Sequence, residues 1–434
     1  MIYNKLKFKY NLNLSEVLFI LIPVFLIGSG PFASNLAISI ISLIFIFKIF
    51  FRNLYIEPNK YLYFTLICFI ILIISALTSE YVLISFLKSL AYLRFLIFPI
   101  AVYYLLNSNE KLFLYFYNIL WLCILIVTID GLIQYFYGEN SIGFILNNFF
   151  GYEKHPYKLL MGYKVQGLFA DEGILGSYLS RLFPILIGLS IYLKKIDNKI
   201  FYLIYFLVSV NILLSGERVA LILFVISNFL LLIFIKEIRN KLLKIMFFIV
   251  IIYSSFIVLD TKIYDRMIKS TINSIVKVNE TKEINLFILS KEHEPLIFSA
   301  TKIFKNNFLL GVGPTNFRRA CNEKENFLLQ KNTNILKKAC STHPHNYYFQ
   351  ILAEVGIIGF LFYSFCIIYF FSKVLFNKNK IPNYIRCMII AIILSIFPFI
   401  VTGNFFNSWL SCFHFLPIPF ILNYFRKDEI NVQG

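Results

Sequence analysis

Two histidines separated by a single proline, His343 and His345, stand where the sequence changes from polar to apolar. Pro344 disfavours helical geometry at His343, whereas the residues from Tyr347 onward are apolar enough to enter a membrane as a helix. His345 and the following Asn346 therefore fall beside the first turn of that helix, at a predicted boundary between water and membrane. A neutral imidazole with an unperturbed pKa of about 6.5 accepts a proton near pH 7. The chemistry that this stretch indicates is general base catalysis.

Two other interpretations of the histidine pair stay open: a helix cap or surface pair, and a metal site. Zinc in proteins normally has three or four ligands. No second cluster at ligand spacing stands out, although His293 and Glu294 could converge with the pair in space. We therefore favour a base over a cap and a cap over a metal ligand, and we expect no metal and no other cofactor.

Composition requires the elements that position these residues to be membrane helices. Hydrophobic residues make up 59% of the 434 residues and charged residues only 15%, which is outside the range of soluble domains. The apolar segments are continuous and about 20 residues long, as helical spans require, and they do not alternate in polarity as barrel strands do. The net charge of +18 comes mostly from short loops between these segments. Membrane lipids are therefore expected partners and nucleic acid is not.

Twelve apolar segments organise the chain, so we expect an all-α polytopic membrane protein with about 12 transmembrane helices. Basic residues gather in alternate loops, which the positive-inside rule places in the cytoplasm. The expected regions are 1–259 with spans one to nine, 260–346 as one large extracytoplasmic loop between spans nine and ten, and 347–434 with spans ten to twelve and a cytoplasmic tail. The predicted spans cover approximately residues 14–28, 36–51, 61–77, 82–106 and 112–137, a sixth segment after Gly173 that contains Arg181, then residues 200–214, 219–235, 245–259, 347–371, 387–401 and 409–425.

One arginine lies in a tight turn on the predicted outer side. The seventh and eighth spans are joined only by Ser215, Gly216, Glu217 and Arg218, and the number of spans before this turn places it outside the membrane. A cation there is an exception to the positive-inside pattern. We favour a role for Arg218 in binding an anion, over an ion pair with Glu217 or contact with a lipid phosphate.

Three further cations lie within predicted spans. An intramembrane cation needs a partner, a watery cavity or a route for its side chain to reach the interface. For Lys88, near the outer end of the fourth span, anion binding and outward extension stay equally open. Arg94, deeper in the same span, is expected to pair with a carboxylate for structural reasons. Arg181 is expected to form an internal ion pair, with Asp171 and Glu172 within reach.

The large loop contains a cysteine pair and a glycine-rich turn. Cys321 and Cys340 flank the stretch ahead of His343, and an oxidising exterior would let them form a disulfide that limits the motion of the histidines. Two free thiols stay open as the alternative. Residues 295–306 are expected to form a short amphipathic helix. The glycine-rich turn 310–317 follows, and it lacks the Lys-Ser/Thr ending of a nucleotide-binding P-loop.

The order of these residues resembles a known signature. His345 and Asn346, followed after nine residues by Gly356 and one helical turn later by Gly359, resemble the signature of the O-antigen ligase and polymerase superfamily of polytopic glycosyltransferases. The turn that carries Arg218, the glycine-rich turn and the single large outer loop are similar to features of the same family. The resemblance implies an active site on the outer, periplasmic face of the bacterial inner membrane.

The activity that the resemblance implies is transfer of a glycan from an undecaprenyl-pyrophosphate carrier to a sugar hydroxyl. In the ligases the acceptor is the lipid A core, and in the polymerases it is another carrier-linked glycan. One large outer loop rather than two favours a ligase. A polymerase and a protein O-oligosaccharyltransferase stay open as alternatives within this chemistry. A transporter of lipid-linked glycans is the alternative of a different class, disfavoured because no inverted repeat is seen.

The resemblance also implies roles for individual residues. His345 would be the general base and Arg218 would bind the pyrophosphate, since a guanidinium bonds two phosphate oxygens at once. His343 would support the base or set its tautomer, and Asn346 would orient it by a hydrogen bond. Weaker candidates for binding the same anionic ligand are Lys88, Arg266 and Arg318.

The sequence departs from the family pattern ahead of the glycine-rich turn. It has His293, Glu294 and Pro295 where family members often have an arginine followed by a tryptophan. A second phosphate-binding arginine is therefore missing at that place, or Arg266 supplies it.

Overall fold

The structure is a computed structural model of the chain. It describes residues 12–28, 31–52, 54, 60–151, 158–278, 284–286, 290–323, 339–376 and 380–433. These residues are mainly helical, which agrees with the all-α membrane protein expected from the composition. The described strands are β1 (Val276–Val278) and β2 (Ile284–Leu286), a short antiparallel pair in the large loop.

Helices form where the sequence is continuously apolar, and short helices form in the large loop. Before that loop come α2 (Leu14–Ile20), α3 (Ile22–Phe25), α4 (Phe32–Phe51), α5 (Lys60–Leu77), α6 (Val82–Ser108), α7 (Lys111–Tyr137), α8 (Ser141–Phe150), η2 (Gly167–Phe169), α9 (Leu175–Tyr192), α10 (Asn198–Leu214), α11 (Arg218–Phe234), η3 (Lys236–Ile238) and α12 (Arg239–Leu259). The large loop contains α13 (Thr261–Tyr264), η4 (Asp265–Lys269), α14 (Ser270–Ile275), α15 (Glu294–Asn306) and α16 (Phe317–Cys321). The chain then continues through α18 (Tyr347–Phe376), α19 (Asn383–Ser395), α20 (Ser408–Phe415) and α21 (Ile418–Gln433).

Seven described helices are long and apolar enough to cross a membrane by length and composition, namely α4, α5, α6, α7, α9, α18 and the segment that ends with α12. Four shorter apolar helices, α8, α10, α11 and α19, have between 10 and 17 residues. Each of the twelve predicted spans coincides with one or two helices. The chain is therefore a multi-pass membrane protein, and the count of twelve spans stays a prediction.

Prolines account for the interruptions in the predicted spans. The first span is divided into α2 and α3 at Leu21, just before Pro23, and the twelfth is divided into α20 and α21 around Pro417. Proline lacks an N–H group and disfavours helical geometry at the residue before it. In the eleventh span α19 ends at Ser395, earlier than predicted, and Pro398 follows in an irregular segment. That segment packs against the histidine motif, as described below.

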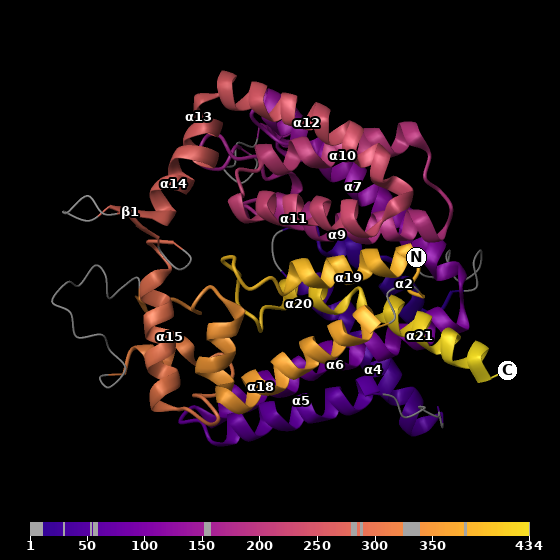
Figure 1. Ribbon diagram of the computed structural model, residues 1–434, viewed down its shortest axis with the longest axis vertical. Coiled ribbons are helices and arrows are strands. Elements are labelled where there is room, and N and C mark those ends of the chain that lie inside the picture. The colour runs from indigo at the N-terminus through magenta and orange to yellow at the C-terminus, as the bar shows by residue number, and fades with distance from the viewer. Residues whose placement is uncertain are drawn as a thin grey trace.

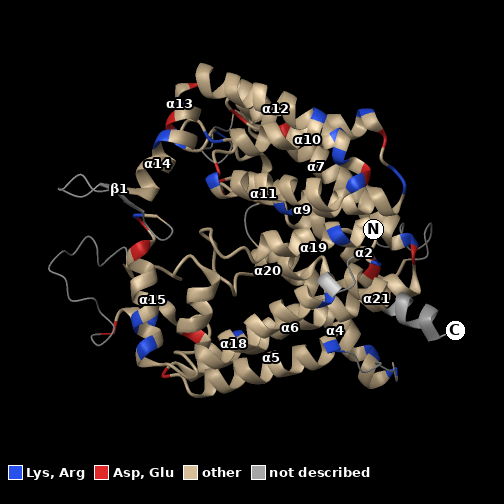
Figure 2. Cartoon of the chain, viewed as in Figure 1, with Lys and Arg blue, Asp and Glu red and all other residues tan. Residues whose placement is uncertain are grey.

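The long helices run side by side, and the two ends of this bundle differ (Figure 1). The helices of the large loop, α13, α14 and α15, all lie at one end, whereas α2 and α21 lie toward the other. We call these the loop end and the opposite end. Charged residues gather at both ends and are sparse in the band between them (Figure 2). This distribution is the one expected of helices that cross an apolar layer.

Helix α9 is the most enclosed span, and it packs against α7, α10, α11 and α19. Its contact with α19 depends on Gly188, where an added Cβ would lie 2.8 Å from the Cβ of Cys387 and 2.9 Å from the carbonyl oxygen of Tyr384. Small residues allow such close approach of two membrane helices, for which van der Waals packing supplies much of the stabilisation. This central packing fixes the first residues of α9 and α11, which lie toward the loop end and carry part of the candidate site.

Candidate active site

Helix α18 carries the histidine motif at its start and is broken at Gly356, which has φ 73° and ψ −169°. The glycine-rich turn of the large loop closes this break by backbone hydrogen bonds. On one side, the N–H groups of Val312 and Gly313 donate to carbonyls in the preceding turn of α18, at 3.0 and 2.9 Å. On the other side, the N–H of Ile357 donates to the carbonyl of Phe308 at 2.9 Å. The loop therefore supplies the partners that the broken helix lacks.

The glycines at this junction are required by space as well as by conformation. An added Cβ at Gly356 would lie 2.4 Å from the carbonyl oxygen of Leu309, and one at Gly311 would lie 2.4 Å from the carbonyl carbon of Glu354. Both glycines have positive φ, which other L-residues rarely adopt. The hydroxyl of Ser75 in α5 donates to the carbonyl of Glu354 at 3.0 Å, which anchors the junction to a neighbouring helix.

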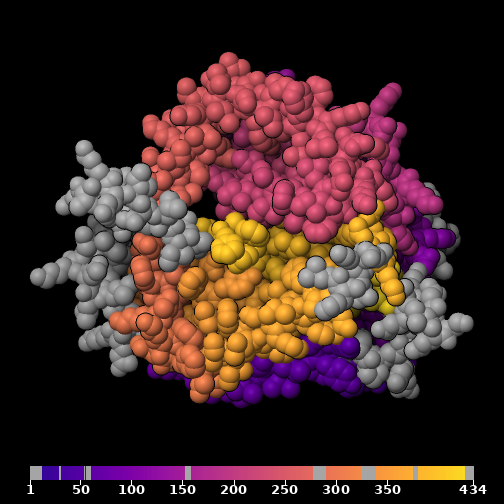
Figure 3. Space-filling model, viewed as in Figure 1, coloured from indigo at the N-terminus to yellow at the C-terminus, as the bar shows by residue number. Residues whose placement is uncertain are grey.

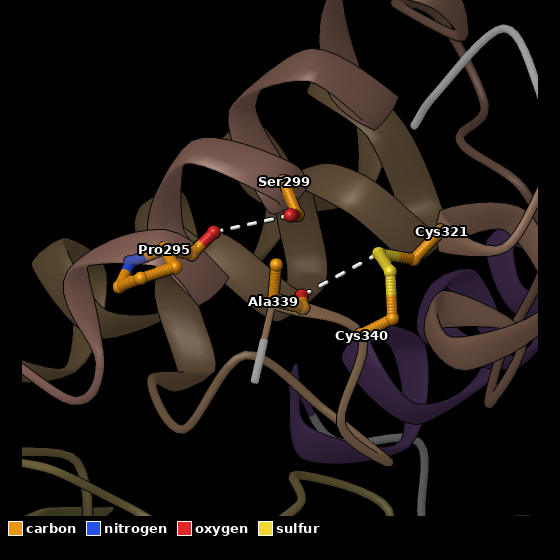
Figure 4. Close-up of a disulfide and its surroundings, with 5 residues drawn as sticks. All are labelled: Pro295, Ser299, Cys321, Ala339 and Cys340. Atoms are coloured by element: carbon orange, nitrogen blue, oxygen red, sulfur yellow. Dashed lines mark hydrogen bonds between the residues drawn. A yellow bond between two sulfur atoms is a disulfide. The ribbon is translucent and has the colours of Figure 1, made fainter. Parts of the chain in front are cut away.

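A disulfide fixes the remaining side of the large loop. Cys321, at the end of α16, is bonded to Cys340, with Cα atoms 5.5 Å apart (Figure 4). This is the pair for which a bridge was expected. Helix α15 lies beside it, and its Ser299 hydroxyl donates to the carbonyl of Pro295 at 3.0 Å. The bridge ties α16 to the residues just ahead of the histidine motif.

His345 is held in an unusual backbone conformation by the segment that follows α19. Its φ is 55°, in the left-handed region that costs a non-glycine residue about 1–3 kcal/mol. The N–H of Thr402 donates to the His345 carbonyl at 2.8 Å. Earlier in the same segment, the carbonyl of Ile396 accepts a hydrogen bond from the Tyr348 hydroxyl at 2.7 Å. The segment that follows the early end of α19 therefore supports the backbone around His345.

Asn346 acts as the cap of α18. Its side-chain oxygen accepts from the N–H groups of Tyr348 and Phe349 at 3.0 and 3.4 Å, and its amide nitrogen donates to the carbonyl of Pro398 at 2.8 Å. Asn346 is buried, and these bonds engage both ends of its amide. The structure thus makes Asn346 a residue that orients the backbone of His345, and a direct contact with substrate stays a prediction.

Three histidine rings meet at the loop end. His345 lies between His343 and His293, with ring centroids 4.1 Å and 5.0 Å away. In each flanking histidine Nδ1 lies at hydrogen-bond distance from a hydroxyl: Thr342 Oγ1 is 2.9 Å from His343, and Ser290 Oγ is 2.5 Å from His293. Nε2 of His343 is buried, and within the described part of the chain nothing bonds to it. The flanking rings are thus oriented by hydroxyl groups, and in His343 the nitrogen without a described partner is Nε2.

Burial keeps this cluster neutral. It lowers the pKa of His345 below the ordinary value of 6.5, while the backbone of Thr402 acts in the opposite direction. Burial, followed by the charge of His345, lowers the pKa of His293 to about 4 and that of His343 to about 3. Because protons on neighbouring rings repel, the cluster takes up one proton before a second, and His345 accepts the first. This is the order that a base at His345 requires.

Arg218 begins α11 and reaches toward the large loop. Its Nη1 donates to the carbonyl of Ser270 at 3.1 Å and to the hydroxyl of Ser274 at 2.9 Å, both in α14. The charge of Arg218 contributes to the lowered pKa of His293, so the guanidinium lies within electrostatic reach of that ring. The loop end therefore places a cation near the ring that flanks the candidate base, between parts of the chain that are far apart in sequence.

Glu217 does not neutralise its neighbour Arg218. Its carboxylate accepts from the N–H of Gly176 at 2.5 Å and from the Ser177 hydroxyl at 2.6 Å, which caps the start of α9. Burial raises the pKa of Glu217 to about 7, against the effects of these bonds and of the nearby charge of Arg181. The charge of the buried Arg181 acts on Glu217, but no ion pair of Arg181 is found among the described residues, and the expected partners Asp171 and Glu172 are exposed.

Two more cations lie beside the turn that carries Arg218. An added Cβ at Gly216 would lie 3.0 Å from Cγ of Lys164 and 3.7 Å from Cγ of Arg266, so both side chains run alongside this residue. Arg266 also donates from Nε to the Gly216 carbonyl at 3.2 Å. Burial, the charge of Arg266 and that of Arg218 lower the pKa of Lys164, with Glu217 acting in the opposite direction.

On the face shown in Figure 3, the surface is hollowed between the salmon residues of α12 to α14 and the orange and yellow residues below them.

The other predicted cations are placed elsewhere. Lys88 on α6 and Arg318 on α16 are exposed, and no described contact joins either side chain to the histidines or to Arg218. Arg94 donates to Asn35 at 3.0 Å and to Ser408 at 3.3 Å. Its expected carboxylate partner is not found among the described residues, since no acid there lies within ion-pair distance of it. Arg94 is held by neutral groups instead.

Neither of two surface cavities found in the structure coincides with this site. One, of about 710 Å³, lies at the opposite end between α7 and the turn after α9, and another, of about 390 Å³, lies between the ends of α7 and α12. No group of three His, Cys, Asp or Glu side chains in the described ranges is arranged to hold a metal ion. Metal-independent chemistry stays a prediction.

Sequence reasoning missed Lys164 and gave His293 only a conditional place. A lone lysine in a loop forms no motif, but the signal that singled out Arg218 would have found it, since Lys164 also lies on the predicted outer side. His293 is brought to His345 by the folding of the large loop, which sequence spacing does not reveal. Of the predicted residues, the structure brings together His343, His345, Asn346, Arg218 and Arg266.

Comparison with known families gives one match in this region. Residues 203–364 match the family model described as O-antigen ligase. The matched segment runs from α10 into α18, so it contains Arg218, Arg266, His293 and His345 but not Lys164. No curated protein matches the chain.

Proposed function

Because residues 203–364 belong to the O-antigen ligase family, within the O-antigen ligase and polymerase superfamily, we propose that this chain is a ligase-type glycosyltransferase. It moves a glycan from an undecaprenyl-pyrophosphate carrier to a sugar hydroxyl of the lipid A core. The reaction takes place at the loop end, which faces the periplasm when the protein lies in the inner membrane. The observation that carries this proposal is the placement of His345 between two neutral histidines, with Arg218 within electrostatic reach of one of them, His293.

His345 acts as the general base in this reaction. The acceptor hydroxyl gives its proton to the imidazole of His345 as its oxygen forms a bond with the anomeric carbon of the donor. The low pKa of the ring keeps it neutral and ready to accept that proton near pH 7. The ring of His343 packs against that of His345, with 4.1 Å between their centroids, and Asn346 holds the start of α18 in place.

Arg218 serves the leaving group. The bond between the anomeric carbon and the carrier oxygen breaks, and the electron pair leaves with the pyrophosphate. This leaving group is already a weak base, so it needs neutralisation of charge more than a proton. The guanidinium of Arg218 is suited to that task because it is planar, permanently charged and able to bond two oxygens. Lys88 and Arg318 are not required.

The test is complementation of a deletion strain with wild type, His345→Ala or Arg218→Ala at matched expression in the membrane. Gel profiling of surface glycans reads out the product. We expect wild type to restore long chains on the lipid A core, and both variants to lose them while carrier-linked polymer accumulates.

Other outcomes would contradict this proposal in distinct ways. Single-repeat caps left on the core in the deletion strain would indicate a polymerase. An unchanged lipid A profile with loss of protein-linked glycan would indicate an oligosaccharyltransferase that modifies proteins. Full activity of His345→Ala would remove the catalytic role of that residue and would favour a transporter.

A further inference from the structure

A cavity of about 710 Å³ lies between α7 and the turn that joins α9 to α10, away from the histidine motif. Helix α9 begins at Leu175, where Glu217 caps it beside Arg218, and it runs for 18 residues. At 1.5 Å per residue α9 is about 27 Å long, so the turn that follows it lies at the opposite end of the bundle. The cavity joins two lysines of this turn, Lys194 and Lys195, with aromatic and apolar residues of α7 and α10.

The side chain of Lys195 leans onto α7. Its Nζ lies 5.3 Å from the centroid of the Tyr117 ring, and it donates to the side-chain oxygen of Asn118 at 3.5 Å. An ammonium group is attracted to the face of an aromatic ring, so these contacts keep the charge at the cavity. The amide nitrogen of Asn118 has no partner within the described ranges, and it is a second donor beside the ammonium group.

The backbone of the turn brings a second lysine to the same cavity. At the end of α9 the N–H of Lys195 donates to the carbonyl of Ser190 at 2.9 Å, and the N–H of Lys194 donates to that of Ile191 at 3.1 Å. Lys194 has φ 54°, and glycine is the residue usually found at this position of a helix end. Lysine takes up the less favourable conformation there, and its charge adds to that of Lys195.

The protein does not neutralise these two lysines. Across the part of the chain that the structure describes, no carboxylate lies within ion-pair distance of either ammonium group. Asp197 is the acid that lines the cavity, and its carboxylate accepts from the N–H groups of Lys199 and Ile200 at 2.8 and 3.1 Å, which caps α10. Two lysines against one engaged aspartate leave the cavity with a net positive charge.

The cavity continues into apolar surface toward the middle of the bundle. On α7, Leu122, Ile126 and Ile129 are exposed and spaced as residues of one helix face. On α10, Ile200 and Leu203 are exposed in the same way. Leu122 and Ile200 both line the cavity, and α7 packs against α10, so the two apolar stripes start at the same place. The tyrosine and tryptophan of the cavity are the residue types that gather at the level of lipid head groups.

We propose that this cavity holds the head group of an anionic phospholipid. Lys194, Lys195 and Asn118 bind its phosphate, and its acyl chains lie along the stripes of α7 and α10. A ligand that is negative at one end and apolar at the other matches cations that border an apolar surface, whereas a soluble anion would leave the stripes unused. The site is separate from the proposed transfer reaction and does not depend on it. In the proposed orientation it faces the cytoplasm.

Tryptophan fluorescence tests the site directly. The chain has two tryptophans, Trp121 in the cavity and Trp409 buried in α20, so Trp409→Phe leaves Trp121 as the only one. The full chain with this change is reconstituted in phosphatidylcholine vesicles that contain a small, equal share of either brominated phosphatidylglycerol or brominated phosphatidylcholine. Bromine quenches a tryptophan that it contacts. We expect phosphatidylglycerol to quench Trp121 with an apparent affinity about tenfold higher than that of phosphatidylcholine.

The test variant carries Lys194→Gln and Lys195→Gln in the same background, and we expect it to lose the preference for phosphatidylglycerol. The matched control carries Lys236→Gln and Lys244→Gln, which remove the same charge from exposed lysines of another turn, and it should keep the preference. Thermal unfolding shows that each protein is folded. Native mass spectrometry of phospholipid retained by the chain with both tryptophans gives the same comparison without Trp409→Phe.

Three results would overturn the proposal. Equal quenching by the two brominated lipids would mean that the cavity does not select an anionic head group. Loss of the preference in the control variant as well would assign it to the overall charge of the protein. Displacement of brominated phosphatidylglycerol by glycerol phosphate at an equal concentration would show a site for a soluble phosphate, to which the apolar stripes contribute nothing.

Discussion

At the scale of single residues, the reaction proposed above depends on the charge state of His345. The ring must be neutral to accept a proton, and burial lowers its pKa below 6.5. Its neutral form is therefore present at pH values above that lowered pKa and is lost as the pH falls through it. We expect kcat/KM to be level near neutral pH and to fall on an acidic limb whose midpoint lies below 6.5, the ordinary pKa of histidine. The measurement is a pH profile of transfer by the purified protein in nanodiscs.

His293 and His343 do not disturb this profile, because their pKa values of about 4 and about 3 keep them neutral while His345 titrates. Asp171→Asn, a change at an exposed acid remote from the histidine motif in sequence, serves as a control and should leave the acidic limb in place. An acidic limb centred above pH 6.5 would contradict the environment described for His345.

At the scale of elements, the junction between the glycine-rich turn and the broken helix α18 decides whether the histidine motif is presented at all. Alanine at Gly356 would require φ near 73° and a Cβ contact of 2.4 Å with a backbone oxygen, which cannot move as a side chain can. We expect Gly356→Ala to destabilise the protein by about 2 kcal/mol or more and to reduce transfer in proportion to the unfolded fraction. Thermal unfolding in detergent, together with the transfer assay, measures both effects.

Gly173→Ala is the comparison for this change. Gly173 has no positive φ, and an added Cβ there would meet only the end of the Leu160 side chain at 3.3 Å. We expect that variant to unfold within a few degrees of wild type. If Gly356→Ala were as stable as Gly173→Ala, the docking of the loop into α18 would be wrong.

At the scale of the whole molecule, the two ends of the bundle must lie on opposite sides of the membrane. The large loop defines one end, and basic residues also gather toward the other (Figure 2). The turn with Lys194 and Lys195 follows the end of α9. We expect a cysteine at position 305 to react with a membrane-impermeant maleimide in spheroplasts, and a cysteine at position 194 to react only after the membrane is permeabilised. Parental protein is the control, since its free cysteines lie in or beside apolar helices. Equal labelling of both positions in intact spheroplasts would contradict the orientation.

Much of this architecture follows from composition and spacing. Continuous apolar segments predicted the helices, and an exception to the charge rule predicted the importance of Arg218. The approach of His293 to His345 was not predictable in the same way, because it depends on how 52 residues of loop fold. The docking of residues 308–313 into α18 was also hidden, since hydrogen bonds between backbone groups leave no pattern of side-chain types. Lys164 was not predicted because no motif surrounds it in the sequence.

The backbone hydrogen bonds between residues 308–313 and α18 limit which substitutions this sequence can accept over evolutionary time. The hydrogen bonds that join residues 308–313 to α18 are made by backbone groups, so they do not depend on the side chains at the positions that make them. Gly311 and Gly356 are exceptions, and each is required by the backbone of the other segment. Descendants of this protein can therefore diverge in most of the large loop and still inherit both glycines together. A lineage that lost one of them would have to rebuild the support of this helix by another route.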